Sequence, residues 1–570
     1  MNKNGADLIV DTLIKNGVEY VFQLPGGKLG PLLMALKKRE EIKVVTVRHE
    51  QNAGFMAQGI GRMTGKPGVV MTTSGPGALN LVTPLATATS DGDPVLAIAG
   101  QVPQAKLVTP YPQNPNISGV MNDSTITKYA KEIQHTDALA DEVANAYVSS
   151  INGNPGAVFM DIPGNILLAE TTKSGLAFST LVNQLDNTIS DEAAILSAVE
   201  KIKAAKRPVI IVGARAADDN AAQGHAGAAV DNAAAAIQGF VKKTGIPVVE
   251  TFEATGLLTH EFSQNYVGRV GLFNNLPGDE LVFNSDLVIT LGLNLVEYWA
   301  SVWNTDNKRI IDIDTVVDHL DETYLPDTIL LGNIAKNLKN ITNSITKQAI
   351  TDEWKMVVHD LQEKLTAKKK IPSQTTEDAL HPLEIVDSLQ KIIDAHPNTT
   401  VVMDGGSHEV WLGSYLNVYR PKHFLMSDGE QTLGVGLPWA ISAALLRPEE
   451  KILSSGGDGS FMFSSQELAT VANYNLNIVQ VIWVDKEYNM VEFQQELDYN
   501  GQKEGVDIDY IGYKEMAESY GIKAARVRSK EALDAALKEA YATSEPRVIE
   551  MIEDNHENIH LRDKEPFKKY

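Results

Sequence analysis

The sequence predicts an α/β protein made of three consecutive doubly wound parallel-sheet domains. Along almost the whole chain, short apolar runs typical of strands alternate with stretches typical of helices, and this alternation favours parallel sheets. Polar connectors near 174–190 and 364–377 divide the alternation into three blocks. A chain of 570 residues can bury a core in each block. We therefore expect domains at 1–180, 190–345 and 375–555, followed by a tail at 556–570.

The first block begins the pattern with helical stretches at 6–16 and 51–64 and strand-like runs at 44–47, 69–72, 95–99 and 157–161. The third block is similar in size and in its alternation of strands and helices. Two related domains are therefore expected to flank a different middle one.

The middle block contains strand-like runs at 209–212, 247–249 and 287–290. The turn Gly213-Ala214-Arg215-Ala216 after the first run lacks the third glycine and the acidic partner of a dinucleotide-binding turn. We interpret it as structural, which disfavours an FAD- or NAD-dependent oxidoreductase. The Ala-rich stretch 226–237 is expected to form a helix packed on the sheet.

The third block holds the most informative segment, a strand that ends in glycines and an aspartate. A run from Lys451 leads into Gly456-Gly457-Asp458-Gly459-Ser460, a helix is expected from about 463 to 474, and the next strand-like run, 478–484, ends on Asp485. Parallel strands joined by a helix bring their carboxyl ends together, where α/β sheets bind ligands.

Two kinds of group meet at that edge. Gly457, Gly459 and the following helix N-terminus offer backbone N–H groups to a phosphate. Asp458 and Asp485 offer carboxylates, and Mg²⁺ prefers one or two of these together with phosphate oxygens. The segment therefore predicts a Mg²⁺–diphosphate site.

Composition excludes several classes of protein. The formal charge is −23, which argues against nucleic acid and anionic membranes as partners. The chain has no Cys, so disulfides, cysteine nucleophiles and thiolate metal sites are excluded, and a cytoplasmic location is expected. Residues 1–7 are polar, and no apolar stretch approaches membrane-spanning length.

The glycine–aspartate segment resembles the diphosphate- and metal-binding motif of thiamine diphosphate (ThDP) enzymes, in which Gly-Asp-Gly is followed one helix later by Asn or Asp. In that family the position two beyond supplies a backbone carbonyl to the metal. The resemblance implies three metal ligands: Asp458, Asp485 and Glu487, the last at a position where relatives often carry Gly. It also implies cofactor contacts from Gly457, Gly459, Ser460 and Met490.

A second motif, Arg48-His49-Glu50-Gln51-Asn52-Ala53, follows the strand at 44–47. It resembles the activating-Glu motif of ThDP enzymes, which implies that Glu50 is catalytic. In the family this Glu hydrogen-bonds the aminopyrimidine ring and promotes the imino tautomer, whose nitrogen removes the thiazolium C2 proton. The resulting ylid acts as an electron sink. In isolation, Glu50 would instead be a carboxylate that stabilises a helix N-terminus.

Two further loops of the third block resemble cofactor-binding segments. In the loop 428–438, small residues let the backbone approach a ring closely. By resemblance, the Gln431 carbonyl receives the 4′-amino group and Leu433 holds the cofactor in its bent conformation. In Gly406-Ser407-His408, both Ser407 and His408 are expected to donate hydrogen bonds to the diphosphate, the alternative for His408 being a surface-loop histidine.

Over nearly its whole length the chain resembles the acetolactate synthases, most closely their catabolic, FAD-independent branch. The matching segments are 73–81, 268–273 and 488–496. The resemblance implies that two pyruvates condense to 2-acetolactate with release of CO₂, through the ylid and a hydroxyethyl enamine, as in acetoin formation. ThDP and Mg²⁺ are the implied cofactors. FAD is not expected, because the middle block lacks the Arg-rich signature that contacts FAD in the biosynthetic branch.

The helix after Asp485 is expected to line the substrate pocket through Met490, Val491 and Gln494. Gln494 is the expected substrate contact because it is polar and lies one turn further on. Met490 and Val491 are also compatible with ordinary core positions.

One loop departs from the family pattern. Acetolactate synthases of this branch carry a His-Gln segment ahead of Thr127-Lys128-Tyr129, and here these two positions are Tyr111 and Pro112. Gln113 is the expected substitute, one place along, in a proline-rich loop of different shape. The departure bears on the choice of donor and acceptor, not on ThDP binding.

Three alternatives stay open beside acetolactate synthesis. The first is a ThDP-dependent 2-oxo acid decarboxylase, or a carboligase with a different donor or acceptor. The second is a non-catalytic ThDP-fold subunit, against which Glu50 argues. The third, which the glycines of the middle block disfavour, is an FAD- or NAD-dependent oxidoreductase; pyruvate oxidase, whose fold is similar, needs FAD and O₂.

The resemblance also implies an assembly. Glu50 and the glycine–aspartate loop that serve one cofactor come from different subunits in the family, so a homodimer or homotetramer with its active site at the subunit interface is expected. The charged and aromatic tail, 559–570, could lie over the site entrance, although a disordered terminus is the default expectation.

Overall fold

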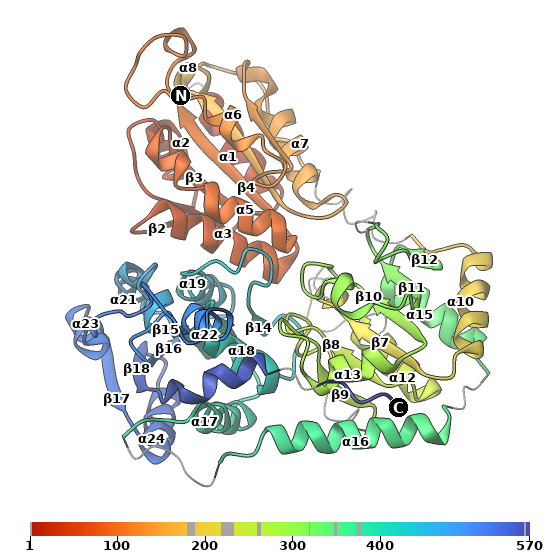
Figure 1. Ribbon diagram of the computed structural model, residues 1–570. Helices are drawn as coiled ribbons and strands as arrows, with labels where there is room; N and C mark the ends of the chain where they lie inside the picture. The colour runs from red at the N-terminus through yellow and green to blue at the C-terminus, as the bar shows by residue number, and fades with distance from the viewer. Residues whose placement is uncertain are drawn as a thin grey trace. The chain divides into compact units, whose positions relative to one another are not determined.

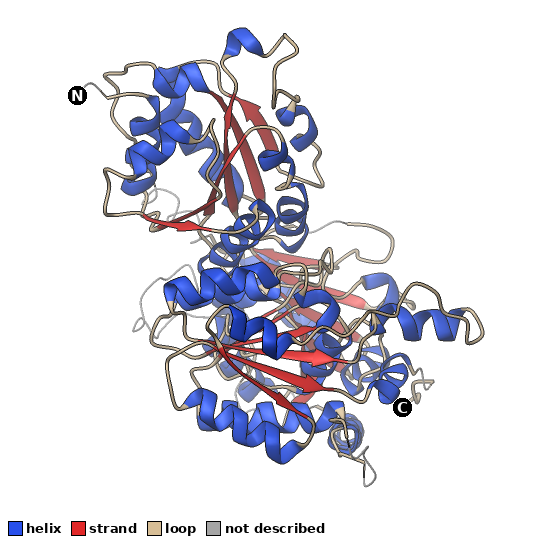
Figure 2. Cartoon of the chain, turned by 90° about the vertical axis from the view of Figure 1, so that its left-hand side faces the viewer, coloured by secondary structure: helices blue, strands red, loops and turns tan. Residues whose placement is uncertain are grey.

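The computed structural model describes residues 3–178, 188–217, 233–258, 264–317, 320–346, 350–372, 378–563 and 566–570. It confirms the predicted α/β class. Three six-stranded sheets, all of them parallel, follow one another along the chain, with helices packed against them (Figure 1; Figure 2). No helix within these ranges is long and apolar enough to cross a membrane.

The first sheet has the order β2-β1-β3-β4-β6-β5. Its central strands β3 and β4 are buried along their whole length, which is why they appear in the sequence as continuous apolar runs. The strands are β1 (Tyr20–Gln23), β2 (Lys43–Thr46), β3 (Gly68–Thr73), β4 (Val95–Gln101), β5 (Tyr129–Glu132) and β6 (Ala157–Pro163). The helices are α1 (Gly5–Lys15), α2 (Gly30–Leu36), α3 (Glu50–Thr64), α4 (Pro76–Leu79), α5 (Val82–Asp91), α6 (Ile117–Met121), α7 (Leu139–Ile151) and α8 (Gly164–Leu168).

The third sheet has the order β14-β13-β15-β16-β18-β17, which repeats the order of the first when strands are counted along the chain. The expectation of two related domains around a different one is therefore confirmed in topology. Its strands are β13 (Thr400–Met403), β14 (Phe424–Leu425), β15 (Ile452–Gly457), β16 (Ile478–Val484), β17 (Lys523–Val527) and β18 (Arg547–Ile552). Its helices are α17 (Pro382–Ala395), α18 (Ser407–Tyr415), α19 (Gly436–Leu446), α20 (Asp458–Phe461), α21 (Leu468–Tyr474), α22 (Asn489–Asp498), α23 (Tyr513–Ser519) and α24 (Lys530–Tyr541).

The middle sheet has a different order, β12-β11-β10-β7-β8-β9. Its strands are β7 (Pro208–Val212), β8 (Val248–Glu250), β9 (Tyr266–Arg269), β10 (Leu287–Leu291), β11 (Arg309–Asp314) and β12 (Thr328–Leu331). Its helices are α10 (Glu192–Ala204), α12 (Ala233–Thr244), α13 (Pro277–Asn284), α14 (Ala300–Trp303), α15 (Ile334–Ser344) and α16 (Asp352–Lys368). Of the Ala-rich stretch, 226–232 lies outside the described residues, and α12 buries Ile237 and Phe240 in the core of this sheet.

Packing divides the described chain into two compact units. One comprises 1–185 with 429–447 and 464–474, and the other comprises 186–428, 448–463 and 475–570. The middle and third sheets thus share a unit, and Phe252 and Leu276 of the middle block are buried in the core of the third.

Two local expectations differ from the structure. The helix expected from about 463 to 474 is broken: α20 begins at Asp458, a 3-10 turn covers Ser465–Glu467, and α21 begins at Leu468. The tail is not a disordered terminus in its described part. A 3-10 helix spans Asn555–Arg562, and beyond it Tyr570 donates its backbone N–H to Asn284 of α13 at 3.0 Å.

Candidate active site

The glycine–aspartate loop (the cradle), for which the sequence predicts a diphosphate site, lies at the carboxyl edge of the third sheet. The chain leaves β13 toward β14 and returns to β15 on the other side, so β13 and β15 flank the point where the strand order reverses. Ligands of open α/β sheets bind at such a point. Gly457 ends β15 there and Asp458 follows it. Asp404 follows β13, and its backbone N–H donates to the Ser455 carbonyl at 2.9 Å.

Short hydrogen bonds fix the glycine–aspartate loop. The Gly457 N–H donates to Ser460 Oγ at 3.1 Å, and the Gly459 N–H donates to Asp458 Oδ1 at 2.9 Å. A Cβ on Gly459 would lie 2.7 Å from the Tyr488 ring, closer than real Cβ contacts allow. The second glycine of the motif is therefore required by packing as well as by its expected approach to a phosphate.

The structure brings the two predicted carboxylates together. Asp458 is buried, and its Oδ2 accepts a hydrogen bond from the Lys486 N–H at 2.9 Å. Lys486 is the residue directly after Asp485, at the end of β16. Asp485 Oδ1 in turn accepts from the Glu487 N–H at 3.1 Å. Both carboxylates thus accept backbone hydrogen bonds from the same short segment at the ends of the neighbouring strands β15 and β16.

Burial and mutual repulsion perturb these acids. Burial raises the pKa of Asp458 to about 6. It raises the pKa of Asp485 well above its usual range, with further contributions from Glu553 and Asp458. Glu553, wholly buried behind them, has a pKa raised to about 8, first by burial. Acids crowded in this way are stabilised as carboxylates by a nearby cation, so the donor set fits Mg²⁺.

Ser407 and His408 lie in the first turn of α18, beside the cradle. Both are buried, and a Cβ on Gly457 would lie 3.4 Å from His408 Nδ1. Burial lowers the pKa of His408 to about 3, which a hydrogen bond with the Asp404 backbone offsets only in part. His408 Nε2 has no hydrogen-bond partner among the described residues. A buried ring nitrogen left free beside an N–H-lined turn is what a site for an anionic ligand would contain.

Helix α22 carries the predicted substrate residues. Met490 is partly buried against the core of the third sheet, which fits its alternative reading as a core position. Val491 is 49 % exposed, and Gln494 donates through Nε2 to the Met490 carbonyl at 2.8 Å. Asn489 Oδ1, at the start of the helix, is buried and has no hydrogen-bond partner within the part of the chain that the structure describes.

The side chain of Glu487 is bonded to groups other than the two aspartates. Its Oε2 accepts a hydrogen bond from Asn555 Nδ2 at 2.9 Å, and its Oε1 lies 3.5 Å from Lys503 Nζ. The extra charge that this position carries relative to Gly is thus shared with an amide and an ammonium group. The C-terminal segment that supplies Asn555 could not be placed from the sequence.

In the other unit, Glu50 is the first residue of α3. The ring of His49 caps the helix by accepting the Gln51 N–H at 3.2 Å. Asn80, just after α4, donates through Nδ2 to Glu50 Oε2 at 3.0 Å. A Cβ on Gly77 would lie 3.2 Å from Glu50 Oε1, so the small residue keeps this oxygen accessible. The sequence did not point to Asn80, although it belongs to the 73–81 segment.

The loop of Gln431 and Leu433 belongs to the same unit as Glu50. Gln431 adopts a left-handed backbone, with φ of 48°, and Gly434 follows with φ of 93°. Thr432 Oγ1 and Thr87 Oγ1 of α5 are hydrogen-bonded at 2.9 Å, and the Gly429 N–H donates to Asp91 Oδ1 at 3.0 Å. Helix α5 therefore holds the loop in its strained conformation.

The loop that departs from the family pattern places Gln113 beside Gly75, in the 73–81 segment that also contains Asn80. Gln113 has φ of 60°, and its Cβ lies 2.9 Å from where a Cβ on Gly75 would be. Asn114 Nδ2 closes the loop by donating to the carbonyls of Lys106 and Leu107. Sequence reasoning missed Lys28, whose Nζ lies 5.5 Å from the centre of the Tyr111 ring and brings a cation to this corner.

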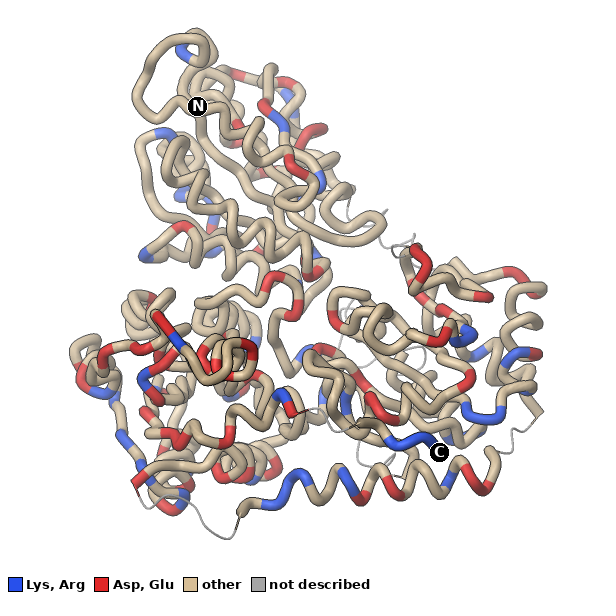
Figure 3. The backbone as a smooth tube through the Cα atoms, in the orientation of Figure 1, with Lys and Arg blue, Asp and Glu red and all other residues tan. Residues whose placement is uncertain are grey.

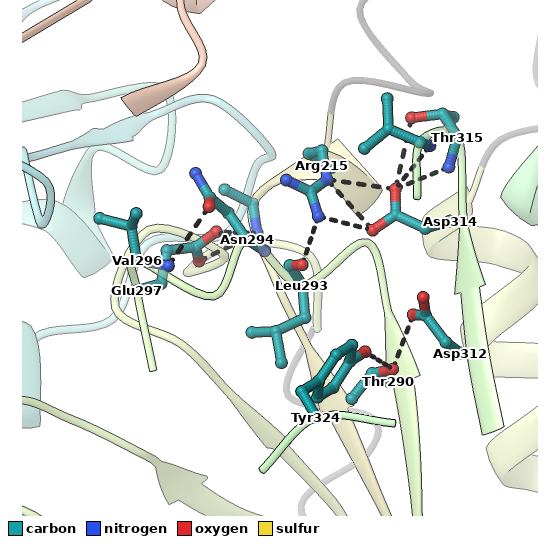
Figure 4. A network of polar contacts seen from close by, with 12 residues as sticks. Arg215, Thr290, Leu293, Asn294, Val296, Glu297, Asp312, Asp314, Thr315 and Tyr324 are labelled. Carbon is teal, nitrogen blue, oxygen red and sulfur yellow. Dashed lines mark hydrogen bonds and ion pairs between the residues drawn. The ribbon is translucent and has the colours of Figure 1, made fainter. Parts of the chain in front are cut away.

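The middle sheet has its own reversal point, between β7 and β10, and buried side chains occupy it (Figure 4). Arg215 donates through Nε and Nη2 to Asp314 at 2.9–3.1 Å, and through Nη2 to the Leu293 carbonyl. Burial, and next the Asp314 charge, raises the pKa of Asp312 to about 7. The turn Gly213-Ala214-Arg215-Ala216, interpreted from the sequence as structural, thus supplies the arginine of a buried ion pair.

Comparisons with known proteins agree with this geometry. Residues 3–120 match "Thiamine pyrophosphate enzyme, N-terminal TPP binding domain", residues 195–341 match the central domain, and residues 404–551 match the C-terminal TPP binding domain. The acetolactate synthase of Bacillus subtilis (strain 168) is 37 % identical over 98 % of this chain and 95 % of its own length. The chain belongs to the acetolactate synthase family of thiamine diphosphate enzymes.

Other acetolactate synthases align over similar lengths. The catabolic acetolactate synthase of Raoultella terrigena is 35 % identical, over 97 % of this chain and 96 % of the relative. The acetolactate synthase isozyme 1 large subunit of Escherichia coli K12 is 29 % identical, over 98 % and 95 %. The resemblance inferred from short motifs is therefore confirmed over the whole length, and the chain is an enzyme of the acetolactate synthase type.

Proposed function

We propose that this acetolactate synthase family member condenses two molecules of pyruvate to 2-acetolactate and releases CO₂, using ThDP and Mg²⁺ and no FAD. The observation that carries the proposal is the cradle at the end of β15. There the crowded Asp458 and Asp485 lie at the end of neighbouring strands, and the ring of His408 lies beside Gly457 with its Nε2 unpartnered among the described residues. ThDP, when bound, supplies an electron sink after loss of its C2 proton.

The residues of the cradle are proposed to hold the cofactor's diphosphate and metal. Asp458, Asp485 and the Glu487 carbonyl would bind Mg²⁺, while the N–H groups of the loop with Ser460 and Ser407 would bind phosphate oxygens. His408 would contact the diphosphate through Nε2. The bond with the Asp404 backbone belongs to Nδ1, because Nε2 is the unpartnered nitrogen. In the neutral ring Nδ1 then carries the proton, so Nε2 becomes a donor only when the ring is protonated beside the anion.

The residues around Glu50 are proposed to perform the proton transfer. Glu50 would bond the aminopyrimidine ring, with Asn80 fixing its Oε2, and the Gln431 carbonyl would accept from the 4′-amino group while Leu433 supports the bent cofactor. Because Gln431 has a left-handed backbone, its carbonyl points in a direction that neither a regular helix nor a strand provides.

Substrate contacts are proposed for Gln494, Val491 and Gln113, with Met490 between cofactor and substrate. A 2-oxo acid needs donors for its carboxylate and carbonyl oxygens, and the amides of Gln494 and Gln113 are suited to this. The proposal for Gln113 rests on its contact with Gly75 in the segment that also contains Asn80.

FAD independence is proposed from the middle block. At its reversal point Arg215 is engaged by Asp314 and the Leu293 carbonyl, and Asp312 lies close by (Figure 4). Bringing a flavin dinucleotide there would require its diphosphate to lie against these carboxylates or to displace the ion pair.

We also propose the remaining features that the resemblance implied: domains at 1–180, 190–345 and 375–555, and a homodimer or homotetramer with the active site at the subunit interface. Exposed Met462 and Phe463, directly after α20, are 40 % and 47 % accessible and suit such an interface. Lys and Arg alternate with Asp and Glu, as along α16, so the charges suit small-molecule rather than nucleic-acid partners (Figure 3). A cytoplasmic location stays a prediction from the Cys-free composition.

The test is a product assay on the purified chain with pyruvate, ThDP and Mg²⁺, and with FAD absent. Acetolactate and CO₂ are expected in a ratio of one to one, and chelation of the metal should abolish both. Acetaldehyde as the sole product would replace the proposal by the 2-oxo acid decarboxylase that the altered 108–116 loop leaves open. Product formation only after addition of FAD would contradict the proposed cofactor set.

A further inference from the structure

A buried carboxylate outside the predicted site lies against the start of α3. Glu467 ends the 3-10 turn Ser465–Glu467, and its side chain is fully buried. Its Oε1 accepts two hydrogen bonds, from the Arg48 N–H at 2.8 Å and from Asn52 Nδ2 at 3.0 Å. Its Oε2 accepts from Thr470 Oγ1 at 2.5 Å.

The two residues held by Oε1 bracket Glu50. Arg48 lies two positions before the first helical residue and Asn52 two positions after it. A helix start presents unsatisfied N–H groups and the positive end of the helix dipole, both of which a carboxylate stabilises. His49 caps α3 from within the helix's own sequence, and Glu467, 419 positions away from Arg48, holds the residue just before that cap.

The bonds to Glu467 matter because Glu50 has few fixed neighbours of its own. Its Oε2 is held by Asn80, while its Oε1 faces Gly77, which has no side chain. The direction of the Glu50 side chain therefore depends on where α3 begins and on how firmly its first turn is fixed. In a buried setting of low dielectric, the hydrogen bonds that the Glu467 carboxylate accepts are stronger than equivalent bonds in water.

We propose that Glu467 is a positioning residue for Glu50, fixing the first turn of α3 so that the Glu50 carboxylate meets the aminopyrimidine ring. This inference rests on the proposed function of Glu50. It assigns Glu467 no contact with substrate, cofactor or metal.

The first test uses the apo protein. In Glu467→Gln the amide oxygen can still accept the two bonds of Oε1 but carries no charge, and in Asn52→Ala one of the two donors is removed. We expect the backbone amides of 48–53 to exchange with deuterium at least fivefold faster in both variants. Thr470→Val, which removes only the bond to Oε2, is the matched control and should stay within twofold of wild type.

The second test measures C2-proton exchange of bound ThDP by NMR together with the Kd of ThDP by calorimetry. Glu467→Gln and Asn52→Ala should slow C2 exchange at least fivefold while Kd changes less than threefold, because the diphosphate contacts lie elsewhere. If Glu467→Gln fails to fold, Asn52→Ala decides the outcome. Wild-type exchange rates in the folded variants would overturn the inference. Failure of the wild-type protein to accelerate C2 exchange over free ThDP would instead overturn the proposed function of Glu50.

Discussion

Asn80 Nδ2 lies 3.0 Å from Glu50 Oε2, and this amide is the one hydrogen-bond donor to the Glu50 carboxylate among the contacts of the described residues. The bond joins the residue after α4 to the first residue of α3. It leaves the other oxygen, beside Gly77, for a ligand. An acid held by one oxygen and open at the other is arranged to bond a nitrogen of a bound ring.

Replacing Glu50 by Gln should slow C2-proton exchange of bound ThDP by a factor of at least 10², within the range that a positioned acid–base group contributes. The amide keeps the bond partner for Asn80 after rotation, so folding and ThDP affinity should change little. NMR of the bound cofactor measures the exchange. Asn80→Ala should slow it less, by about tenfold, since it removes one neutral-to-charged bond of about 1.5 kcal/mol. Unchanged exchange in Glu50→Gln would refute the catalytic assignment.

Replacing Asp458 by Asn should weaken Mg²⁺-dependent ThDP binding at least tenfold, because the neutral amide is a poorer Mg²⁺ ligand and its NH₂ group cannot accept the Lys486 N–H. Calorimetry with and without Mg²⁺ gives the metal-dependent part of the affinity. Glu553→Gln is the control. The raised pKa of Glu553 leaves it largely protonated at pH 7, and the Gln amide oxygen still accepts from Asn558. Normal affinity in Asp458→Asn would remove this aspartate from the metal site.

Mixing the two inactive variants tests the proposed interface. If Glu50 and Asp458 of one active site come from different subunits, a hybrid of Glu50→Gln with Asp458→Asn contains one site with both native residues. Co-refolded or co-expressed mixtures should then recover up to about a quarter of wild-type activity. Random pairing makes about half of the dimers hybrids, and each hybrid has one intact site of its two. Activity no higher than that of the separate variants, with hybrid formation shown by mass spectrometry, would place both residues in one chain.

His408 should make the apo protein sensitive to acid. Its pKa in the folded state, about 3, is lower than the usual 6.5 because of burial. The stability that the neutral ring contributes is therefore complete above pH 6.5 and is lost as the pH falls from 6.5 toward 3, by about 1.4 kcal/mol per pH unit. His408→Asn, whose Nδ2 can replace the ring Nδ1 as a donor, should lose less. Urea unfolding at pH 7.5 and 5.5 compares the two proteins, and equal losses would contradict the burial argument.

Two neighbouring glutamines of α22 offer a matched pair for the substrate site. Gln494→Ala should raise KM for pyruvate about tenfold if its amide bonds the substrate, a loss of about 1.4 kcal/mol. Gln495 is bonded on the other side of the helix to the backbone of Glu504, through both its amide oxygen and its amide nitrogen. Gln495→Ala should therefore leave KM within twofold of wild type. Steady-state kinetics decide, and equal effects of the two substitutions would remove Gln494 from the pocket.

Local sequence patterns were sufficient for the fold class and for the separate pieces of the site. Alternating apolar runs specify parallel strands and helices, and a strand ending in Gly457-Asp458-Gly459 with Asp485 after the next strand places two acids at one edge by topology alone. The equal strand orders of the first and third sheets belong to the fold, because the middle sheet has the same alternation and a different order.

Only the tertiary structure decided which polar groups have partners. The free Nε2 of His408, the Arg215–Asp314 pair, and the bonds of Asn80 to Glu50 and of Glu467 to Arg48 all join residues that are distant in the sequence or depend on burial. The broken helix after Asp458 and the docked tail have the same origin, since packing against other segments overrides local propensity. Motifs are local and can be found in a sequence, whereas burial and long-range hydrogen bonding are properties of the folded chain.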